Sequence, residues 1–206
     1  MKVLVIGSGA REHALVRGLS ADPDVSAVVA APGNPGIDLI AQCEPLADVC
    51  DAAAVLAVAA RHTVDLVVVG PEAPLVAGVS DALREAGYAV YGPSAAAAQL
   101  EGSKSFAKEV MASAGVPTAL AHVCTTMAEV ESALDALGAP HVVKDDGLAA
   151  GKGVVVTDDR EAALAHARAC LAKPDGQLVV DEFLDGPEVS VFCICDGTSV
   201  RALSPA

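Results

Sequence analysis

The segment Val142–Val156 reads Val-Val-Lys-Asp-Asp-Gly-Leu-Ala-Ala-Gly-Lys-Gly-Val-Val-Val, and it predicts how the second half of the chain folds. The β-branched runs at its two ends are typical of strands. Between them lie three glycines and two lysines. A tight hairpin needs only about two to five loop residues, so this longer segment predicts a loop whose backbone N–H and ammonium groups cover a polyphosphate. A Walker loop is excluded because Gly153, rather than Ser or Thr, follows Lys152.

The composition limits the classes of partner and compartment. The 206-residue chain has a net charge of −14, with 53% hydrophobic and 2% aromatic residues. This acidity argues against nucleic acid as a partner, whereas a small anion responds to local charge. The apolar run after Met1-Lys2 is too short for a signal peptide or a membrane span, so no membrane association is expected. The six cysteines lack metal-ligand spacing, which favours a reduced, cytoplasmic protein, and Cys193 and Cys195 are expected to be buried on one strand face.

The first hundred residues predict a doubly wound parallel sheet. Apolar strands alternate with helices that have apolar periodicity. The predicted strands are 3–6, 25–30, 65–69 and 88–91. One helix is predicted directly after the first glycine turn, and two more are predicted at 47–62 and 74–86. A glycine-containing turn follows each strand: Gly7-Ser8-Gly9, Gly33-Asn34-Pro35-Gly36, Gly70-Pro71-Glu72 and Gly92-Pro93-Ser94. Since the carboxyl ends of parallel strands share one edge, these turns predict one ligand site.

The opening strand and glycine turn leave two interpretations open. A dinucleotide-binding domain of an oxidoreductase would need a small residue where Glu12 stands, and an acid where the second strand runs into Pro32-Gly33. Arg11 lies at a helix start, a position that normally favours acids. An arginine beside glycines there favours a site for a phosphate or a carboxylate.

A change of composition near residue 100 predicts a second domain. Ser103 is a suitable N-cap for a helix that ends at Gly115, before Pro117. The remaining pattern predicts strands that alternate with helices around one sheet. The strands are expected at 119–124, 142–144, 154–157, 178–183 and 189–195, and the helices at 127–137 and 159–172. Asp181–Leu184 ends a strand, so its backbone groups are candidates to hold an adenine edge. Glu188 is a candidate to accept hydrogen bonds from a ribose.

Several motifs in this order resemble one enzyme family. They are Val-Ile-Gly-Ser-Gly-Ala-Arg-Glu-His-Ala at 5–14, Pro-Gly-Asn-Pro-Gly at 32–36, Val-Val-Gly-Pro-Glu-Ala-Pro-Leu at 68–75, Gly-Pro-Ser at 92–94, Gly-Ser-Lys-Ser-Phe-Ala-Lys at 102–108, the loop at 142–156, and Glu-Phe-Leu-Asp-Gly-Pro-Glu-Val-Ser at 182–190. With them the chain resembles the N-terminal half of the glycinamide ribonucleotide synthetases, the phosphoribosylamine–glycine ligases of the ATP-grasp superfamily.

The resemblance implies a domain plan. Residues 1–101 would form an N-terminal, substrate-binding pre-ATP-grasp domain with the doubly wound sheet. Residues 102–206 would form the first part of an α+β ATP-grasp domain. That part would contain a helix at 103–115, a small lobe over about 117–187 and the start of a large lobe at 188–206.

The resemblance also implies a reaction in de novo purine biosynthesis. ATP would phosphorylate the glycine carboxylate, and the amine of 5-phosphoribosylamine would then attack the glycyl phosphate to give glycinamide ribonucleotide, ADP and phosphate. Mg²⁺ or Mn²⁺ would assist, with ligands expected beyond residue 206 and none within the chain. A cytoplasmic monomer is expected.

The resemblance implies site residues at the positions of this chain that match the family's motifs. Lys144 and Lys152 would be catalytic. The residues implied to bind ATP are Lys104, Lys144, Gly147, Leu148, Ala149, Ala150, Gly151, Lys152, Gly153, Val154, Asp181, Glu182, Phe183, Leu184 and Glu188. The residues implied to bind the phosphoribosylamine are Gly9, Arg11, Glu12, Gly33, Asn34 and Glu72.

Three departures from the family pattern modify these expectations. Asp145 replaces a usual alanine, and its charge is expected to lie next to Lys144, where it would repel ATP phosphates. Asp181 replaces a usual glutamate. The chain also stops before the family's metal-binding acids, so we expect a truncated form that is inactive by itself. The alternative is a non-catalytic nucleotide-binding fragment or module.

Overall fold

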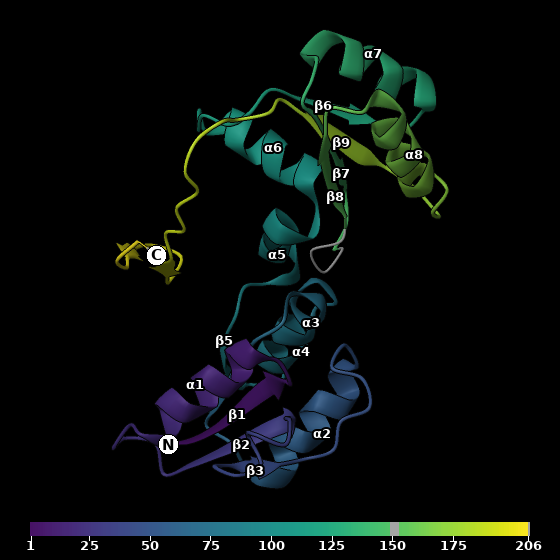
Figure 1. The fold of residues 1–206 in the computed structure, drawn as a ribbon. Helices are drawn as coiled ribbons and strands as arrows, with labels where there is room; N and C mark the ends of the chain where they lie inside the picture. Colours follow the sequence, from purple (N-terminus) through teal and green to yellow (C-terminus); the bar gives the residue numbers. More distant parts are fainter. Residues whose placement is uncertain (149–152, 206) are drawn as a thin grey trace.

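The computed structural model describes residues 1–148 and 153–205, which form two α/β units followed by a small hairpin (Figure 1). The first unit contains a five-stranded sheet in the order β3-β2-β1-β4-β5, with every pair parallel. Its strands are β1 (Lys2–Gly7), β2 (Ala27–Pro32), β3 (Gln42–Cys43), β4 (Leu66–Val69) and β5 (Ala89–Tyr91). The predicted doubly wound sheet is confirmed. Only β3, a two-residue edge strand, was not predicted.

Alternate residues of the central strands pack on opposite faces of this sheet. Val3 and Val5 of β1 pack with Val16 of α1 (Ala10–Ser20) on one face. Leu4 and Ile6 pack on the other face. The helices on that second face are α2 (Ala52–His62), α3 (Glu72–Val76), α4 (Val79–Glu85) and α5 (Ala95–Gly102). Burial on both faces explains why the strands are continuous apolar runs.

The helices of the first unit differ from the prediction at three places in the chain. The helix expected over 74–86 is two helices, because Gly78 takes a left-handed conformation (φ 85°) between them. The helix expected from residue 47 begins only at Ala52, because the Asp51 carboxylate accepts hydrogen bonds from the first free backbone N–H groups. Helix α5 was not predicted, although Ser94 caps it by accepting from Ala97 N.

The second unit is an antiparallel sheet in the order β6-β9-β7-β8. Its elements are α6 (Lys104–Ser113), β6 (Ala121–Cys124), α7 (Met127–Leu137), β7 (His141–Asp145), β8 (Val154–Thr157), α8 (Arg160–Leu171) and β9 (Leu178–Asp181). Helices α7 and α8 cover one face, where Leu134, Leu164 and Leu178 are buried together. Helix α6 lies on the other side of the sheet (Figure 1). The mixed α+β architecture predicted for this unit is confirmed.

The end of the chain departs most from the prediction. Strand β10 (Cys193–Cys195) pairs with β11 (Val200–Ala202) in a hairpin that lies apart from both sheets (Figure 1). Residues 189–192, expected as the start of a strand, have no regular structure, and neither have the two residues before them. Cys193 and Cys195 are exposed, so the expected burial of their thiols is wrong. The apolar pattern predicted a buried face, but no helix or strand of the described chain covers this hairpin.

Within residues 1–148 and 153–205, no helix has both the length and the apolar character required to cross a bilayer.

Candidate nucleotide-binding site

Helix α6 directs two lysines into a cleft. Ser103 begins the helix by accepting a hydrogen bond from Phe106 N. Lys104 and Lys108 are four residues apart and therefore lie on one helix face. Both line a cleft of about 460 Å³ between α6 and the second sheet, together with Lys144, Asp181 and Leu184.

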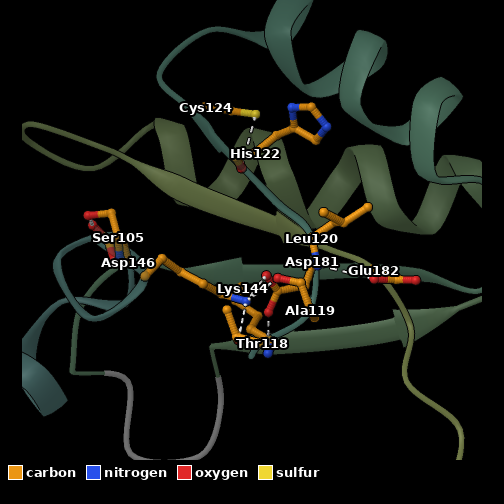
Figure 2. Close-up of polar contacts among 11 residues, drawn as sticks. Ser105, Thr118, Ala119, Leu120, His122, Cys124, Lys144, Asp146, Asp181 and Glu182 are labelled. Carbon is orange, nitrogen blue, oxygen red and sulfur yellow. Dashed lines mark hydrogen bonds and ion pairs between the residues drawn. The ribbon is translucent and has the colours of Figure 1, made fainter. Parts of the chain in front are cut away.

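The strand register brings Lys144 to the same cleft. In the β7–β9 pair, Val142 lies opposite Asp181, so Lys144 is the diagonal neighbour of Asp181 on one sheet face. Lys144 Nζ lies 2.5 Å from Asp181 Oδ2 (Figure 2). Lys108 Nζ lies 3.0 Å from Oδ1 of the same carboxylate. The cleft therefore contains a buried carboxylate between two ammonium groups.

Lys108 was not among the predicted site residues. Its ammonium group donates hydrogen bonds to Thr118 Oγ1 (3.0 Å) and Ala119 O (2.8 Å), on the segment that leads into β6. The signal that could have identified it is its spacing of one helical turn from Lys104 within the motif at 102–108.

Asp145 does not lie beside Lys144, contrary to the expectation. Successive side chains of a strand point to opposite faces, and Asp145 points to the face covered by α8. It is 7% exposed and pairs with Lys173, and this hydrogen bond raises the pKa of Lys173. The acidic partner of Lys144 is instead Asp181.

The two ends of the predicted phosphate loop are anchored separately. Lys104 Nζ donates to Gly147 O at 3.0 Å, and Asp145 N donates to Gly153 O at 2.7 Å. Gly147, Leu148, Gly153 and Val154 line a second cleft, of about 570 Å³, which also contains Lys104, Arg11 and Glu72. The four other predicted loop residues lie outside the described residues: Ala149, Ala150, Gly151 and Lys152.

Asp146, at the start of this loop, joins it to the helix. Its carboxylate accepts hydrogen bonds from Ser105 N (2.7 Å), Ser105 Oγ (2.6 Å) and Gln177 Nε2 (2.6 Å). These contacts place Gly147 beside the first turn of α6. The prediction did not include Asp146, because its role depends on residues far away in the sequence.

The predicted adenine hinge is only partly assembled. Asp181 and Leu184 line the first cleft. Glu182 instead pairs with the backbone of Leu120: its N–H donates to Leu120 O (2.8 Å), and its carboxylate accepts from Leu120 N (3.1 Å). Phe183 is exposed, and Glu188 lies in the irregular segment 187–192, outside the residues that line the cleft.

Glu12 occupies the glycine turn of β1. It is 3% exposed, and Oε2 accepts a hydrogen bond from Gly9 N at 2.6 Å. A Cβ at Gly7 or Gly70 would lie within 2.6 Å or 2.3 Å of the Glu12 side chain. These glycines therefore make room for a glutamate, which explains the departure from a dinucleotide fingerprint. Glu12 was predicted to line the substrate edge, but the structure gives it this buried role.

The other predicted substrate residues follow parallel strands at the same sheet edge. Arg11 donates to Glu72 Oε1 (2.7 Å) and to Gly70 O (3.1 Å). This hydrogen bond and the arginine charge lower the pKa of Glu72. Asn34 donates to Ser8 O at 2.9 Å and accepts from Gly36 N and Ile37 N, so its amide stabilises the turn after β2.

Gly33 also has a structural reason for its small size. It has a φ of 70°, and a Cβ there would lie 2.3 Å from Cys43 Sγ. Its backbone N–H donates to Gly7 O, which links the turns after β1 and β2. Of the predicted edge residues, Arg11 and Glu72 line the second cleft.

Two protein-family models match the two parts of the chain separately. The family model described as "Phosphoribosylglycinamide synthetase, N domain" matches residues 1–101, and that described as "Phosphoribosylglycinamide synthetase, ATP-grasp (A) domain" matches residues 102–206. The chain belongs to the phosphoribosylglycinamide synthetase family. The resemblance indicated by the sequence motifs is thereby confirmed.

Curated members of this synthetase family match the whole chain. Phosphoribosylamine–glycine ligase of Streptomyces coelicolor is 66% identical over 206 residues, which are 100% of this chain and 48% of the relative. The ligase of Mycobacterium tuberculosis (strain H37Rv) is 52% identical, again over 100% of this chain and 50% of the relative. The chain thus spans about half the length of the curated relatives that it matches.

Solved structures give the same fold. The crystal structure of phosphoribosylamine–glycine ligase from Thermotoga maritima has a TM-score of 0.82 and 29% identity, and it covers 100% of this chain and 49% of that one. An N5-carboxyaminoimidazole synthase from Aspergillus clavatus, solved with ADP and 5-aminoimidazole ribonucleotide, has a TM-score of 0.73 at 22% identity over 99% of this chain and 52% of its own. At that identity the likeness supports the fold alone.

Proposed function

We propose that the protein containing this chain uses ATP to join glycine to 5-phosphoribosylamine, giving glycinamide ribonucleotide, ADP and phosphate. Membership of the synthetase family supports the reaction. The structural observation that carries the proposal is the cleft in which Lys104, Lys144 and Asp181 meet beside the ends of the glycine loop.

Lys104 and Lys144 are the proposed ligands of the ATP phosphates. Their ammonium groups come from different elements, α6 and β7, and line one cleft. An ammonium group and a phosphate attract each other strongly where a cleft partly excludes solvent. Gly147 and Gly153 lie at the ends of a loop that would cover the phosphates, and Lys152 within that loop is the second proposed catalytic lysine.

The chemistry requires protection from water. A carboxylate is a poor electrophile until one of its oxygens becomes a leaving group, and a glycyl phosphate would hydrolyse in an open site. A covering loop that excludes water until the amine attacks meets this requirement. We propose this role for residues 147–154.

Arg11 and Glu72 are proposed to receive the phosphoribosylamine. They lie at the carboxyl edge of the parallel sheet, where ligands of such sheets bind, and they line the cleft that reaches Lys104. An exposed guanidinium group is a suitable phosphate ligand. The ion pair with Glu72 would hold it in place before the substrate binds.

Metal, oligomeric state and compartment complete the proposal. Among the described residues, no three His, Cys, Asp or Glu side chains gather into a metal site. We assign no residue of this chain to Mg²⁺ or Mn²⁺. The six cysteines are free in the structure, which favours the reducing cytoplasm as the compartment. A monomer is proposed as the oligomeric state.

Calorimetric titration of ATP into the chain tests the nucleotide site. We expect Lys144→Met to weaken binding about tenfold or more, because it removes a charged phosphate contact. Lys173→Met is the matched control, since Lys173 pairs with Asp145 on the other sheet face, and its ATP affinity should equal that of the wild type. An unchanged affinity in Lys144→Met would remove this lysine from the site.

Phosphate release tests the reaction. In a protein that carries this chain with the remainder of a full-length ligase, release should require both glycine and phosphoribosylamine. Release with ATP alone at the same rate would contradict the proposed ligation. Binding of ATP without any ligation would favour a nucleotide-binding module.

A further inference from the structure

The buried carboxylate of Asp181 is shared between two lysines that differ in their other contacts. Asp181 is 4% exposed, with Oδ2 2.5 Å from Lys144 Nζ and Oδ1 3.0 Å from Lys108 Nζ. Figure 2 shows Asp181 and Lys144 converging near Thr118 and Ala119. One negative charge therefore has two possible counter-ions.

The two lysines are held differently. Lys108 donates hydrogen bonds to Thr118 Oγ1 and Ala119 O, and its side chain is 16% exposed. Lys144 is 32% exposed, and among the described residues its ammonium group has Asp181 as its one polar partner. Lys108 is thus also held by a threonine hydroxyl and a backbone carbonyl, whereas Lys144 has only Asp181 as a polar partner within the part of the chain that the structure describes.

This difference matters when a phosphate attracts Lys144. If Lys144 moves toward the nucleotide, it no longer pairs with Asp181. A buried carboxylate without a counter-ion is strongly unfavourable. Lys108 already lies within ion-pair distance of the other carboxylate oxygen. It can keep Asp181 paired without any movement of the backbone.

We propose that Lys108 is a positioning residue that retains Asp181 as an ion pair and so releases Lys144 to the phosphates of a bound nucleotide. The inference rests on the proposed nucleotide site. It assigns to Lys108 a role that acts through Asp181 and requires no contact between Lys108 and the ligand.

A purely structural role of Lys108 makes a different prediction. Its bonds to Thr118 and Ala119 fasten α6 to the segment before β6, and their loss would harm the cleft whether or not Asp181 is charged. The counter-ion role depends on that charge. Lys108→Met, Asp181→Asn and the double variant therefore form a decisive cycle.

ATP titration of these variants is the first test. We expect Lys108→Met to weaken ATP binding about tenfold or more, because Lys144 then leaves a buried charge unpaired. In the Asp181→Asn background the same substitution should change the dissociation constant less than about twofold. An equal loss in both backgrounds, or no loss in the wild-type background, overturns the inference.

Acetylation of Lys144 in nucleotide-free protein is the second test. With a small amine-reactive reagent and peptide mass spectrometry, Lys108→Met should slow the modification of Lys144 several-fold, since Asp181 then holds Lys144 alone. Asp181→Asn should accelerate it. Equal rates in all three proteins would show that the lysines do not compete for Asp181 and would overturn the inference.

Failure of the proposed function has a separate signature. If wild-type protein does not bind ATP, the nucleotide site itself is wrong, and the inference fails with it. If wild-type protein binds ATP and Lys108→Met binds equally well, only the role of Lys108 is wrong. Circular dichroism of each variant confirms that the chain is folded.

Discussion

At the residue scale, burial should control which cysteines react. Burial raises the pKa of Cys124 to about 11, with a smaller contribution from Glu129, and burial also raises the pKa of Cys170. Cys193 and Cys195 are exposed on the terminal hairpin. The thiolate is the nucleophile, so at pH 8 iodoacetamide should modify the hairpin thiols first and Cys124 last.

Peptide mass spectrometry over a time course measures this order. Protein unfolded in urea is the control, since all six thiols should then react at similar rates. Modification of native Cys124 as fast as Cys193 would contradict the described burial.

The ion pair of Arg11 and Glu72 gives a pH dependence at the same scale. The hydrogen bond from Arg11 lowers the pKa of Glu72 from its ordinary value of 4.5. A lowered folded-state pKa stabilises the protein above the unfolded-state value, and the stabilisation is lost as the pH falls through the folded value. Because both side chains are partly exposed, the effect should be at most about 1 kcal/mol.

Urea unfolding of Arg11→Met at pH 7 and pH 3 measures this effect. The difference in unfolding free energy from the wild type should be present at pH 7 and absent or smaller at pH 3. Glu72→Gln should give the same pattern. A difference that grows toward acid pH would reverse the sign and refute the pairing.

At the scale of the element, one glycine separates two helices and another only weakens a helix. Gly78 has a φ of 85° between α3 and α4, whereas Gly18 lies within α1 and a Cβ there would meet nothing within 4 Å. Left-handed backbone costs about 1–2 kcal/mol for a residue with a Cβ. Gly18→Ala, in contrast, should stabilise the protein by about 0.5–1 kcal/mol.

Thermal or chemical unfolding of Gly78→Ala and Gly18→Ala compares the two directly. The substitution of glycine by alanine should lower the unfolding free energy of the protein at residue 78 and raise it at residue 18. A stabilising Gly78→Ala would mean that α3 and α4 form the continuous helix that the sequence pattern predicted.

At the scale of the whole molecule, the two sheets have separate cores. Leu83 is fully buried against the parallel sheet, and Leu134 is 1% exposed in the core of the second unit. We propose that the domains 1–101 and 102–206 unfold as separate cooperative units. A buried Leu→Ala substitution costs about 2–5 kcal/mol, so Leu134→Ala should destabilise the second unit and Leu83→Ala the first.

Hydrogen exchange with mass spectrometry assigns the effect to each sheet. Leu134→Ala should speed exchange in β6, β7 and β9 and leave β1 and β4 unchanged, and Leu83→Ala should do the reverse. Equal acceleration in both sheets by either variant would show one cooperative unit.

The sequence determined most of the strands and helices and their succession along the chain. Continuous valine runs identified the buried strands, and glycine turns identified the carboxyl edge of the first sheet, because both signals depend on neighbours in the chain. The motifs also identified Lys104, Lys144 and Asp181, which the structure brings to one cleft. Even the direction of Asp145 was available, since adjacent strand residues point to opposite faces.

Only the tertiary structure decided which charges meet. The register of β7 against β9 sets Asp181 diagonal to Lys144, and the packing of α6 brings Lys108 to the same carboxylate. Burial of Glu12 among Gly7, Gly9 and Gly70 likewise depends on two strands that are remote in sequence. The physical reason is that a side chain's partners are fixed by contacts between distant segments, which local patterns along the chain do not specify.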